Sequence, residues 1–444
     1  MAILSKDEAQ ALMKKVLSYS KADECEVNLS GTDKGNIRYA RNEVTTSGRI
    51  TQSQLVVSSA YGKKLGVATI NEFDDASLEK VVRRAEELAQ LAPENPEYVS
   101  ILGPQQYNNP ITYIPATAAI TPKLRSDLVA QSLQVAKDNK VVAAGFLEDT
   151  TTYTAMANSK GLFAYNAATN VAFSITVRTQ DGKGSGYATK GYNDISKLDT
   201  KAATQIATDK AIMSAGAKAI EPGKYTVILE PTAAAVLVER LFFNLDARQA
   251  DEGRSFMSLP SGKSRLGEKL VDERVNIYSD PLNPELPTST WNGDGRPQER
   301  VSWIEKGVVK NFTWGRYWAE KKGAKAIPGP DAAIIEGGTK TLDEMIKGTK
   351  KGILVTRLYY IRDVDPQSLL LTGLTRDGTF YIENGKIQYP VKNFRFNESP
   401  VIMLNNLEEL GKPERTVSDE SNANYLMPPM KIRDFTFTSL SDAV

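Results

Sequence analysis

The sequence predicts an α+β protein, with a duplicated α/β N-terminal domain and then a mostly antiparallel β domain around one long helix. The 444 residues are too many for one ordinary domain. A loop motif occurs twice in the first half of the chain, which indicates a duplication. After residue 221 the pattern changes to many short strand-like runs and a single long apolar helix. The expected domains are residues 1–221 and 222–444.

The N-terminal domain is expected to contain two repeats, at about 1–92 and 121–216, joined by a linker at 93–122 that contains six prolines. The repeated motif is G-K-x-x-G-x-A-T, at residues 62–69 and 182–189. Each copy follows an alternating strand and requires a turn that tolerates positive φ. We interpret the copies as duplicated hairpins; the alternative is a pair of loops presented to a common cleft. The predicted helices are 5–20, 76–91, 124–138 and 201–215, and the predicted strands are 24–29, 36–40, 50–58, 66–70, 141–155 and 171–178.

The C-terminal domain is organised around residues 225–253. A short apolar strand leads into a predicted helix at 231–247, which opens on Pro231 and has apolar residues at three- and four-residue spacing. Zinc peptidases place a His-Glu motif on a helix of this kind. The apolar part of this helix carries one acidic residue, Glu239. Its flanking residues in such a motif are Val238 and Phe243, neither of which can bind a metal. Further strands are predicted at 300–304, 308–314, 352–360, 378–383, 386–389 and 401–404.

Composition excludes several classes of function. The chain has no histidine, so Ser-His-Asp and Cys-His catalysis and the usual zinc sites are excluded. The one cysteine, Cys25, excludes an internal disulfide and is predicted to be a small core residue. A net charge of +1 argues against direct nucleic-acid or anionic-membrane binding. With no signal-peptide pattern and no apolar run of about 18 residues, a cytoplasmic location is expected.

Several stretches, in order along the chain, resemble the TldD/PmbA (TldE) family, whose older name is modulator of DNA gyrase. They are VILEPTAAAVLVERL, DGRPQERVSWIEKGVVKNF, TRLYYIRDVDPQSL, YIENGKIQYPVKN and LMPPMKI. Of these, ENGKI-x-x-PV is the most specific and LMPPMKI the next. The resemblance covers most of the chain and is strongest in its C-terminal half. It implies a duplicated α/β N-terminal domain and a mostly β C-terminal domain.

Catalytic members of this family carry H-E-x-x-x-H on the central helix and a cysteine near the C-terminus as zinc ligands, with the glutamate as general base. In this chain the resemblance places Val238 and Phe243 at the histidines and Asn422, within one or two residues, at the cysteine. Glu239 keeps the glutamate. A zinc ion needs about three protein donors. We therefore predict no metal, no cofactor and no peptide hydrolysis by this chain alone.

The resemblance is closest to the non-catalytic PmbA/TldE branch, which pairs with a zinc-bearing TldD-type subunit. Such complexes act on unfolded or extended peptides, including microcin precursors and antitoxins. A homodimer is also possible for the isolated chain. The candidates for lining a peptide groove are Tyr359, Tyr360, Arg362 and Asp363, which could instead be ordinary edge-strand surface.

Other interpretations remain open at this point. Glu239 is most simply a surface carboxylate, or one paired with Arg240 or Arg248. An enzyme with altered chemistry would use Glu239 with Asp246 or Asp251, two carboxylates within about 5–9 Å. A third hypothesis is a regulatory protein that binds DNA gyrase or a peptide without proteolysis.

Overall fold

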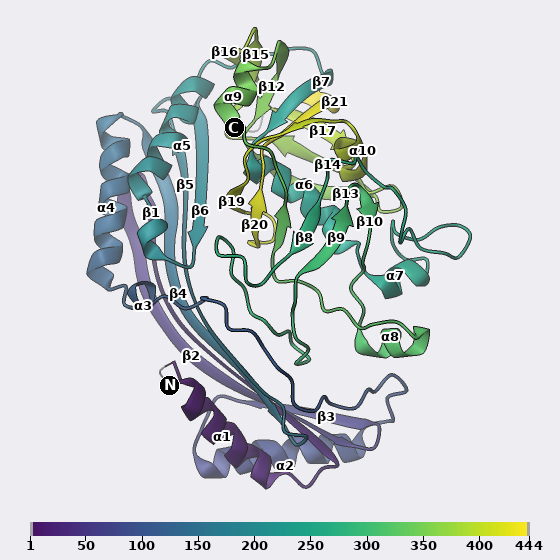
Figure 1. The fold of residues 1–444 in the computed structure, drawn as a ribbon. Coiled ribbons are helices and arrows are strands. Elements are labelled where there is room, and N and C mark those ends of the chain that lie inside the picture. The colour runs from purple at the N-terminus through teal and green to yellow at the C-terminus, as the bar shows by residue number, and fades with distance from the viewer. Residues whose placement is uncertain (1–2, 442–444) are drawn as a thin grey trace.

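The first half of the chain forms one long, curved, antiparallel sheet (Figure 1). The computed structural model describes residues 3–441. The strand order is β3-β2-β1-β4-β5-β6. Strands predicted at 24–29 and 36–40 are one strand, because the polar, glycine-containing residues between them also pair with the neighbouring strand. The strands are β1 (Glu24–Ala40), β2 (Glu43–Tyr61), β3 (Lys64–Ile70), β4 (Val142–Asn158), β5 (Phe163–Arg178) and β6 (Ser185–Tyr192).

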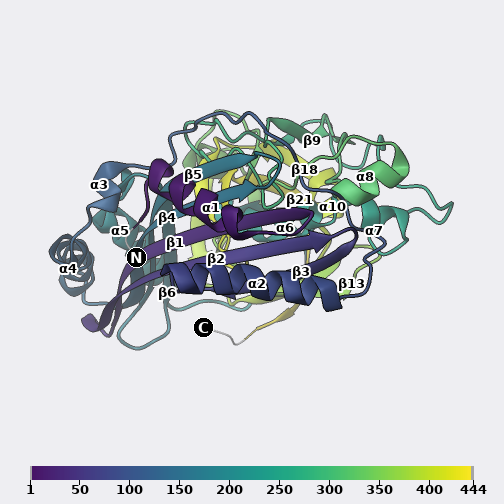
Figure 2. The same ribbon diagram turned by 90° about the horizontal axis from the view of Figure 1, so that it is seen from below.

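The two faces of this sheet have different surroundings. On β5 the residues alternate between buried ones, such as Val171, Phe173 and Ile175, and half-buried ones. The buried residues form the outer face, which four helices cover (Figure 2). The half-buried residues form the inner face, which is turned toward the C-terminal half of the chain. The covering helices are α1 (Lys6–Tyr19), α2 (Asp75–Leu91), α4 (Pro122–Asp138) and α5 (Thr200–Ser214); α3 (Pro115–Ala118) and η1 (Ile195–Lys197) are short.

The repeated G-K-x-x-G-x-A-T motif occupies equivalent hairpins, β2–β3 and β5–β6. The first glycine of each copy, Gly62 or Gly182, has positive φ at the turn. A side chain on the third glycine of the second copy, Gly186, would overlap the carbonyl oxygen of Ala207, and Gly66 meets Ala85 in the same way. These glycines let α2 and α5 lie directly on their strands. The duplicated α/β half predicted from the sequence is confirmed.

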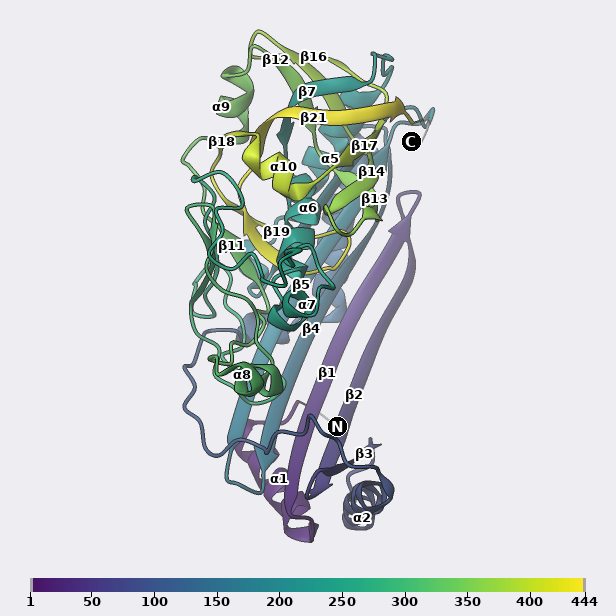
Figure 3. The same cartoon turned by 90° about the vertical axis from the view of Figure 1, so that its right-hand side faces the viewer.

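The second half of the chain forms two further sheets around a central helix, α6 (Pro231–Phe243) (Figures 1 and 3). One sheet has nine strands, in the order β13-β14-β17-β21-β7-β12-β15-β16, with β18 paired to β21. It consists of β7 (Gly223–Leu229), β12 (Lys351–Val355), β13 (Leu358–Asp365), β14 (Leu370–Thr375), β15 (Thr379–Glu383), β16 (Lys386–Pro390), β17 (Phe394–Glu398), β18 (Leu407–Leu410) and β21 (Met430–Leu440).

The other C-terminal sheet has six strands, in the order β10-β9-β8-β11-β20-β19. All pairings in the two sheets are antiparallel except β7 with β12 and β11 with β20. The strands of this six-stranded C-terminal sheet are β8 (Ile277–Ser279), β9 (Val301–Glu305), β10 (Val308–Val309), β11 (Ala333–Ile335), β19 (Glu414–Val417) and β20 (Asn424–Met427). The smaller helices of this half are α7 (Ala247–Asp251), α8 (Arg316–Lys322), α9 (Leu342–Lys347) and α10 (Pro400–Asn405).

Helix α6 is buried over most of its circumference, as expected for a helix with apolar residues on all sides. It ends four residues earlier than predicted. Asn244 caps its C-terminus and also donates from its side-chain amide to the Arg240 carbonyl at 2.9 Å. Asp246 then caps the separate helix α7 by accepting from the Gln249 backbone N–H at 2.8 Å.

Three other predicted elements differ from the structure. Residues 401–404 lie in helix α10, because Pro400 begins a helix after the buried Ser399, whereas an apolar run of four also suits a strand. The predicted strand at 352–360 is two strands, β12 and β13, separated by Thr356 and Arg357. In the predicted strand 308–314, only Val308 and Val309 belong to a strand, and Thr313 forms an isolated bridge with Asp246.

The segment between the two repeats has almost no regular structure between residues 93 and 114. It is nevertheless anchored to the sheet, since the Thr169 N–H donates to the Thr112 carbonyl at 2.9 Å and the Thr112 hydroxyl to the Ala167 carbonyl at 2.6 Å. Cys25 is 1% exposed, which confirms its prediction as a core residue. No helix in residues 3–441 is long and apolar enough to cross a membrane.

Candidate functional site

The site is centred on the Glu239 side chain, which projects from α6 into the interior. Glu239 is 0% exposed, so its interpretation as a surface carboxylate is wrong. The Ser421 hydroxyl donates to its Oε2 at 2.7 Å, and the Tyr425 hydroxyl lies 3.4 Å from the same oxygen. Its Oε1 is buried and has no hydrogen-bond partner among residues 3–441.

The predicted ion pairs of Glu239 are also wrong. Arg240 pairs with Glu420 at 3.5 Å, and Arg248 pairs with Glu97 at 2.8 Å. Burial raises the pKa of the Glu239 carboxyl, and the hydroxyls of Ser418 and Ser421 oppose this effect only in part. The buried environment therefore disfavours the ionised form of Glu239 relative to that of an exposed glutamate.

The loop at residues 418–423, which joins β19 to β20, covers Glu239. Its side chains reach three different elements of the fold. Ser421 contacts Glu239 on α6, and Glu420 accepts from the Ile361 N–H on β13 at 3.2 Å. Asp419 reaches the N-terminal half, where it accepts from the Tyr187 hydroxyl at 2.7 Å. We call this segment the 418–423 loop.

Arg357 anchors the 418–423 loop from the C-terminal half. Its guanidinium donates to Asp419 and to Asp377, each at 2.6 Å. It also stacks 3.8 Å from the centre of the Tyr187 ring. Burial by itself would lower the pKa of Arg357, but the two carboxylates outweigh it and raise the pKa. Ser185 on β6 hydrogen bonds to Asp377, so the cluster joins the two halves of the chain.

A cavity of about 510 Å³ lies between the 418–423 loop and the inner face of the N-terminal sheet. We call it the loop cavity. Its lining includes Asn170, Ser174 and Tyr187 from the sheet and Asn422 and Asn424 from the loop side. The charged residues Lys34 and Glu148 on its floor form an ion pair with each other. Asn422 adopts the left-handed conformation at φ 59°. Asn422, the residue predicted within one or two positions of the family cysteine, thus lies beside a polar sheet surface.

A second cavity of about 510 Å³ lies farther along the same inner face. Asn28, Thr152 and Asn166 from the sheet and Trp291 and Asn292 from the C-terminal half are among the residues that line it. We call it the tryptophan cavity.

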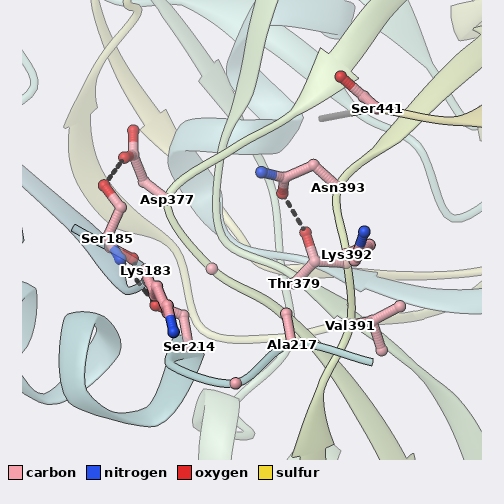
Figure 4. Close-up of a pocket in the computed structure, with 12 residues that line it drawn as sticks. Lys183, Ser185, Ser214, Ala217, Asp377, Thr379, Val391, Lys392, Asn393 and Ser441 are labelled. Atoms are coloured by element: carbon pink, nitrogen blue, oxygen red, sulfur yellow. Dashed lines mark hydrogen bonds between the residues drawn. The ribbon is translucent and has the colours of Figure 1, made fainter. Parts of the chain in front are cut away.

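Another cavity, of about 280 Å³, lies at the seam between α5 and the nine-stranded sheet (Figure 4). Its polar groups largely pair with one another: Thr379 donates to the Asn393 side-chain oxygen at 3.1 Å, and the Ser185 backbone N–H donates to the Ser214 hydroxyl at 2.9 Å. Lys183, which lies in the turn between β5 and β6 and rims the cavity, is exposed. We therefore assign this cavity to the packing of the two halves.

The residues predicted to occupy the family ligand positions do not fit a zinc ion. Val238 has no donor atom and is 1% exposed, within the apolar core. Phe243, at the end of α6, is 55% exposed and has no donor atom either. Asn422 offers only an amide oxygen, a poor ligand for zinc. The residues from 3 to 441 include no cluster of three or more His, Cys, Asp or Glu side chains that could hold a metal.

The two aspartates considered for altered carboxylate chemistry have other roles. Asp246 caps α7, and Asp251 accepts from the Trp318 indole N–H at 2.9 Å and lies 3.4 Å from Lys322. Within the described part of the chain, neither forms a hydrogen bond with Glu239. The structure gives no support to a pair of cooperating carboxylates.

The four groove candidates lie on β13, the edge strand of the nine-stranded sheet. Tyr359 and Tyr360 are 37% and 54% exposed, and Arg362 stacks 4.0 Å from the centre of the Tyr360 ring. Neither these three residues nor Asp363 is among those that line the loop cavity or the tryptophan cavity. They form an exposed surface beside the site.

The sequence did not reveal the cluster of Arg357, Asp377, Asp419 and Tyr187. Asp419 and Tyr187 are 232 positions apart, so no local pattern connects them. The available signal was the repeated motif, because Tyr187 lies in its second copy. We favoured duplicated hairpins for that motif over the alternative, a pair of loops presented to a common cleft.

Comparison with known proteins identifies the class. Residues 222–439 match the PmbA/TldA metallopeptidase C-terminal domain, residues 117–215 its central domain and residues 25–89 its domain 1. The fold and the central helix thus define a metallopeptidase-like protein. The chain belongs to the PmbA/TldD family, as its resemblance predicted.

The relatives in this family are distant. An uncharacterized protein of Methanocaldococcus jannaschii is 25% identical over 376 residues, which are 79% of this chain and 83% of that one. Metalloprotease PmbA of Escherichia coli O157:H7 is 28% identical over 174 residues, 38% of this chain and 37% of that protein.

Two solved structures have the same fold. TldE from Thermococcus kodakarensis has a TM-score of 0.87 at 19% identity, covering 97% of this chain and 99% of that chain. A proposed modulator of a DNA gyrase from Thermotoga maritima has a TM-score of 0.86 at 19% identity, covering 97% and 100%. These similarities confirm the predicted α+β fold class.

Proposed function

We propose that this chain is a zinc-free subunit of a TldD-type metallopeptidase system. In this role it helps to bind and enclose unfolded peptides that a zinc-bearing partner subunit cleaves. One observation carries the proposal: the chain has the family fold, yet it contains no histidine, and the residues that the resemblance aligns with the three zinc ligands are Val238, Phe243 and Asn422. With no histidine in the sequence, no nearby imidazole can take over as a ligand.

The state of Glu239 supports the same proposal. A general base must be ionised and within reach of the water that it deprotonates. Glu239 is instead fully buried, covered by the 418–423 loop, and has a raised pKa. It acts here as a structural side chain that holds the loop by its contact with Ser421.

The proposed partners are a TldD-type subunit and unfolded or extended peptides, in the cytoplasm, with a homodimer of the isolated chain as a further possibility. The name of the Thermotoga maritima protein refers to DNA gyrase. Nothing in the geometry of this site favours binding to gyrase, so we do not propose that function.

The test uses the purified full-length chain, a TldD-type subunit from the same organism, and their mixture. Zinc content is measured by elemental analysis, and cleavage is followed with an unstructured fluorogenic peptide. We expect this chain to contain no stoichiometric zinc and to cleave nothing alone, and we expect the mixture to cleave faster than the partner alone.

The matched control is a mixture in which the glutamate of the partner's zinc motif is changed to glutamine, which should abolish cleavage. Zinc-dependent cleavage by this chain alone would refute the proposal. So would a mixture that is no faster than the partner by itself.

A further inference from the structure

The N-terminal sheet has a polar inner face, which carries no charged residue along β5 from residue 166 to residue 174. From residue 166 to residue 174, the half-buried residues of β5 on this face are Asn166, Ala168, Asn170, Ala172 and Ser174. A sheet face that only packed against a second layer would be rich in apolar residues, as the outer face of the same strand is. Small amide and hydroxyl side chains instead leave space and hydrogen-bonding groups between the two halves.

The two cavities on this face adjoin along β5. Ala168 lines the tryptophan cavity, and Asn170, the next inner-face residue, lines the loop cavity. We call the two together the inner-face trough. Its floor from Asn166 to Ser174 is about 27 Å long, at about 3.4 Å per residue. An extended peptide of about eight residues has the same length and the same two-residue period of side chains.

Charge in the inner-face trough is scarce or already paired. Asp331 is the one charged residue that lines the tryptophan cavity. In the loop cavity, Lys34 is paired with Glu148, and Asp419 is held by Arg357 at 2.6 Å. A charged side chain of an occupant would lose water and gain little counter-charge in return.

Each cavity also has one lining residue with a buried polar atom that lacks a partner among residues 3–441. In the tryptophan cavity it is the indole N–H of Trp291, a residue only 7% exposed. In the loop cavity it is the side-chain oxygen Oδ1 of Asn424. Buried polar atoms in folded proteins are nearly always paired. Both atoms are themselves shielded from solvent, so their side chains must turn toward the cavity to meet a ligand. A peptide backbone then offers a C=O group to the indole N–H and an N–H group to the amide oxygen.

We infer that the inner-face trough binds an extended polypeptide segment of about eight residues with few charged side chains, rich in small polar residues. The inference rests on the proposed function and names its substrate class. The backbone would hydrogen bond to the amide and hydroxyl side chains of the floor. Charged segments would be disfavoured, so this chain would select which part of an unfolded protein enters the shared enclosure.

The experiment measures binding by the full-length chain alone, so it does not depend on a partner. Three labelled peptides of about ten residues share a Ser/Thr/Asn/Gly framework. One is neutral, one carries lysine at alternate positions, and one carries aspartate there. Fluorescence anisotropy gives Kd for each. We expect the neutral peptide to bind at least about tenfold more tightly than either charged peptide.

Two substitutions of one floor residue, Ala168→Asp and Ala168→Lys, provide the decisive comparison. Each substitution should weaken binding of the neutral peptide about tenfold. Ala168→Asp should bind the lysine peptide more tightly than the aspartate peptide, and Ala168→Lys should show the reverse preference. Ala76→Asp, at an exposed position on α2, is the matched control and should change nothing. If the Ala168 variants do not fold, Thr154→Asp at an exposed position in the tryptophan cavity replaces them.

Tighter binding of a charged peptide to the unsubstituted chain would overturn the inference, as would no binding of any peptide or unchanged selectivity in the Ala168 variants. Competition of the bound peptide by a neutral oligosaccharide, but not by unlabelled peptide, would also overturn it. The proposed function fails separately, if the mixture with the partner cleaves no faster than the partner alone.

Discussion

Replacing Glu239 with glutamine should stabilise this protein at alkaline pH. Burial raises the pKa of Glu239, so the folded protein holds this proton more tightly than the unfolded chain does. The stability contributed by the group is therefore complete below the unfolded pKa and is lost as the pH rises through the folded pKa. Glu239→Gln cannot ionise, so it should not show this loss.

The size of the effect follows from the contacts of the side chain. Glutamine keeps an oxygen to accept from Ser421, but its NH₂ replaces an oxygen that has no partner. At pH 5 we expect the variant to lie within about 1 kcal/mol of the parent chain, the net value of one ordinary hydrogen bond. At pH 9 the parent buries an unpaired charged oxygen, and we expect the variant to be more stable by about 1–3 kcal/mol.

The assay is thermal unfolding of both proteins at pH 5, 7 and 9, with the difference in midpoint as the readout. A gain of 1 kcal/mol raises the midpoint by roughly 2–4 °C in a protein of about 150–250 residues. The shift should be smaller in this chain of 444 residues. Glu86→Gln is the matched control, since Glu86 is also buried but pairs with Arg83 at 2.6 Å. That substitution should destabilise the protein at pH 7 and at pH 9 alike. If Glu239→Gln lowered the midpoint equally at all three pH values, Glu239 would be ionised and paired in the fold, and the reasoning would be wrong.

The remaining predictions concern the charge cluster, the helix contacts and the metal frame. Arg357→Met should destabilise the protein by about 3–5 kcal/mol in unfolding experiments, because it removes the ion pair of buried Asp419 and leaves buried Asp377 only its longer contact with Arg376, at 3.8 Å. Arg362→Met, on the exposed edge strand, should cost no more than about 0.5 kcal/mol, and equal losses would contradict this account. Gly186→Ala should cost about 1–3 kcal/mol or more by forcing α5 away from β6, whereas an unchanged melting temperature would show that the helix can move freely. Restoring the family ligands should give zinc uptake near one ion per chain by elemental analysis, and a triple alanine variant should take up none; failure of the restored chain to bind zinc would show that the helix frame itself has changed. The restored positions are Val238→His, Phe243→His and Asn422→Cys.

The sequence supported the fold class because its strongest signals are local and periodic. In strands that pack one face against helices, buried and half-buried residues alternate along the chain. Helix α6 is apolar on all sides. Short elements were less reliable: residues 401–404 read as a strand but form part of α10, since four apolar residues have no period long enough to distinguish the two.

The candidate site divides in the same way. The sequence by itself determined what the site lacks, because the absence of histidine and the identities of Val238, Phe243 and Asn422 are facts of composition that no folding can change. Only the tertiary structure decided what the site contains. Glu239 is buried because Ser421, 182 positions away, closes over it, and the inner-face trough exists because two halves of the chain meet across a polar sheet. Burial and long-range pairing depend on which distant segments pack together, and that information is spread over the whole chain.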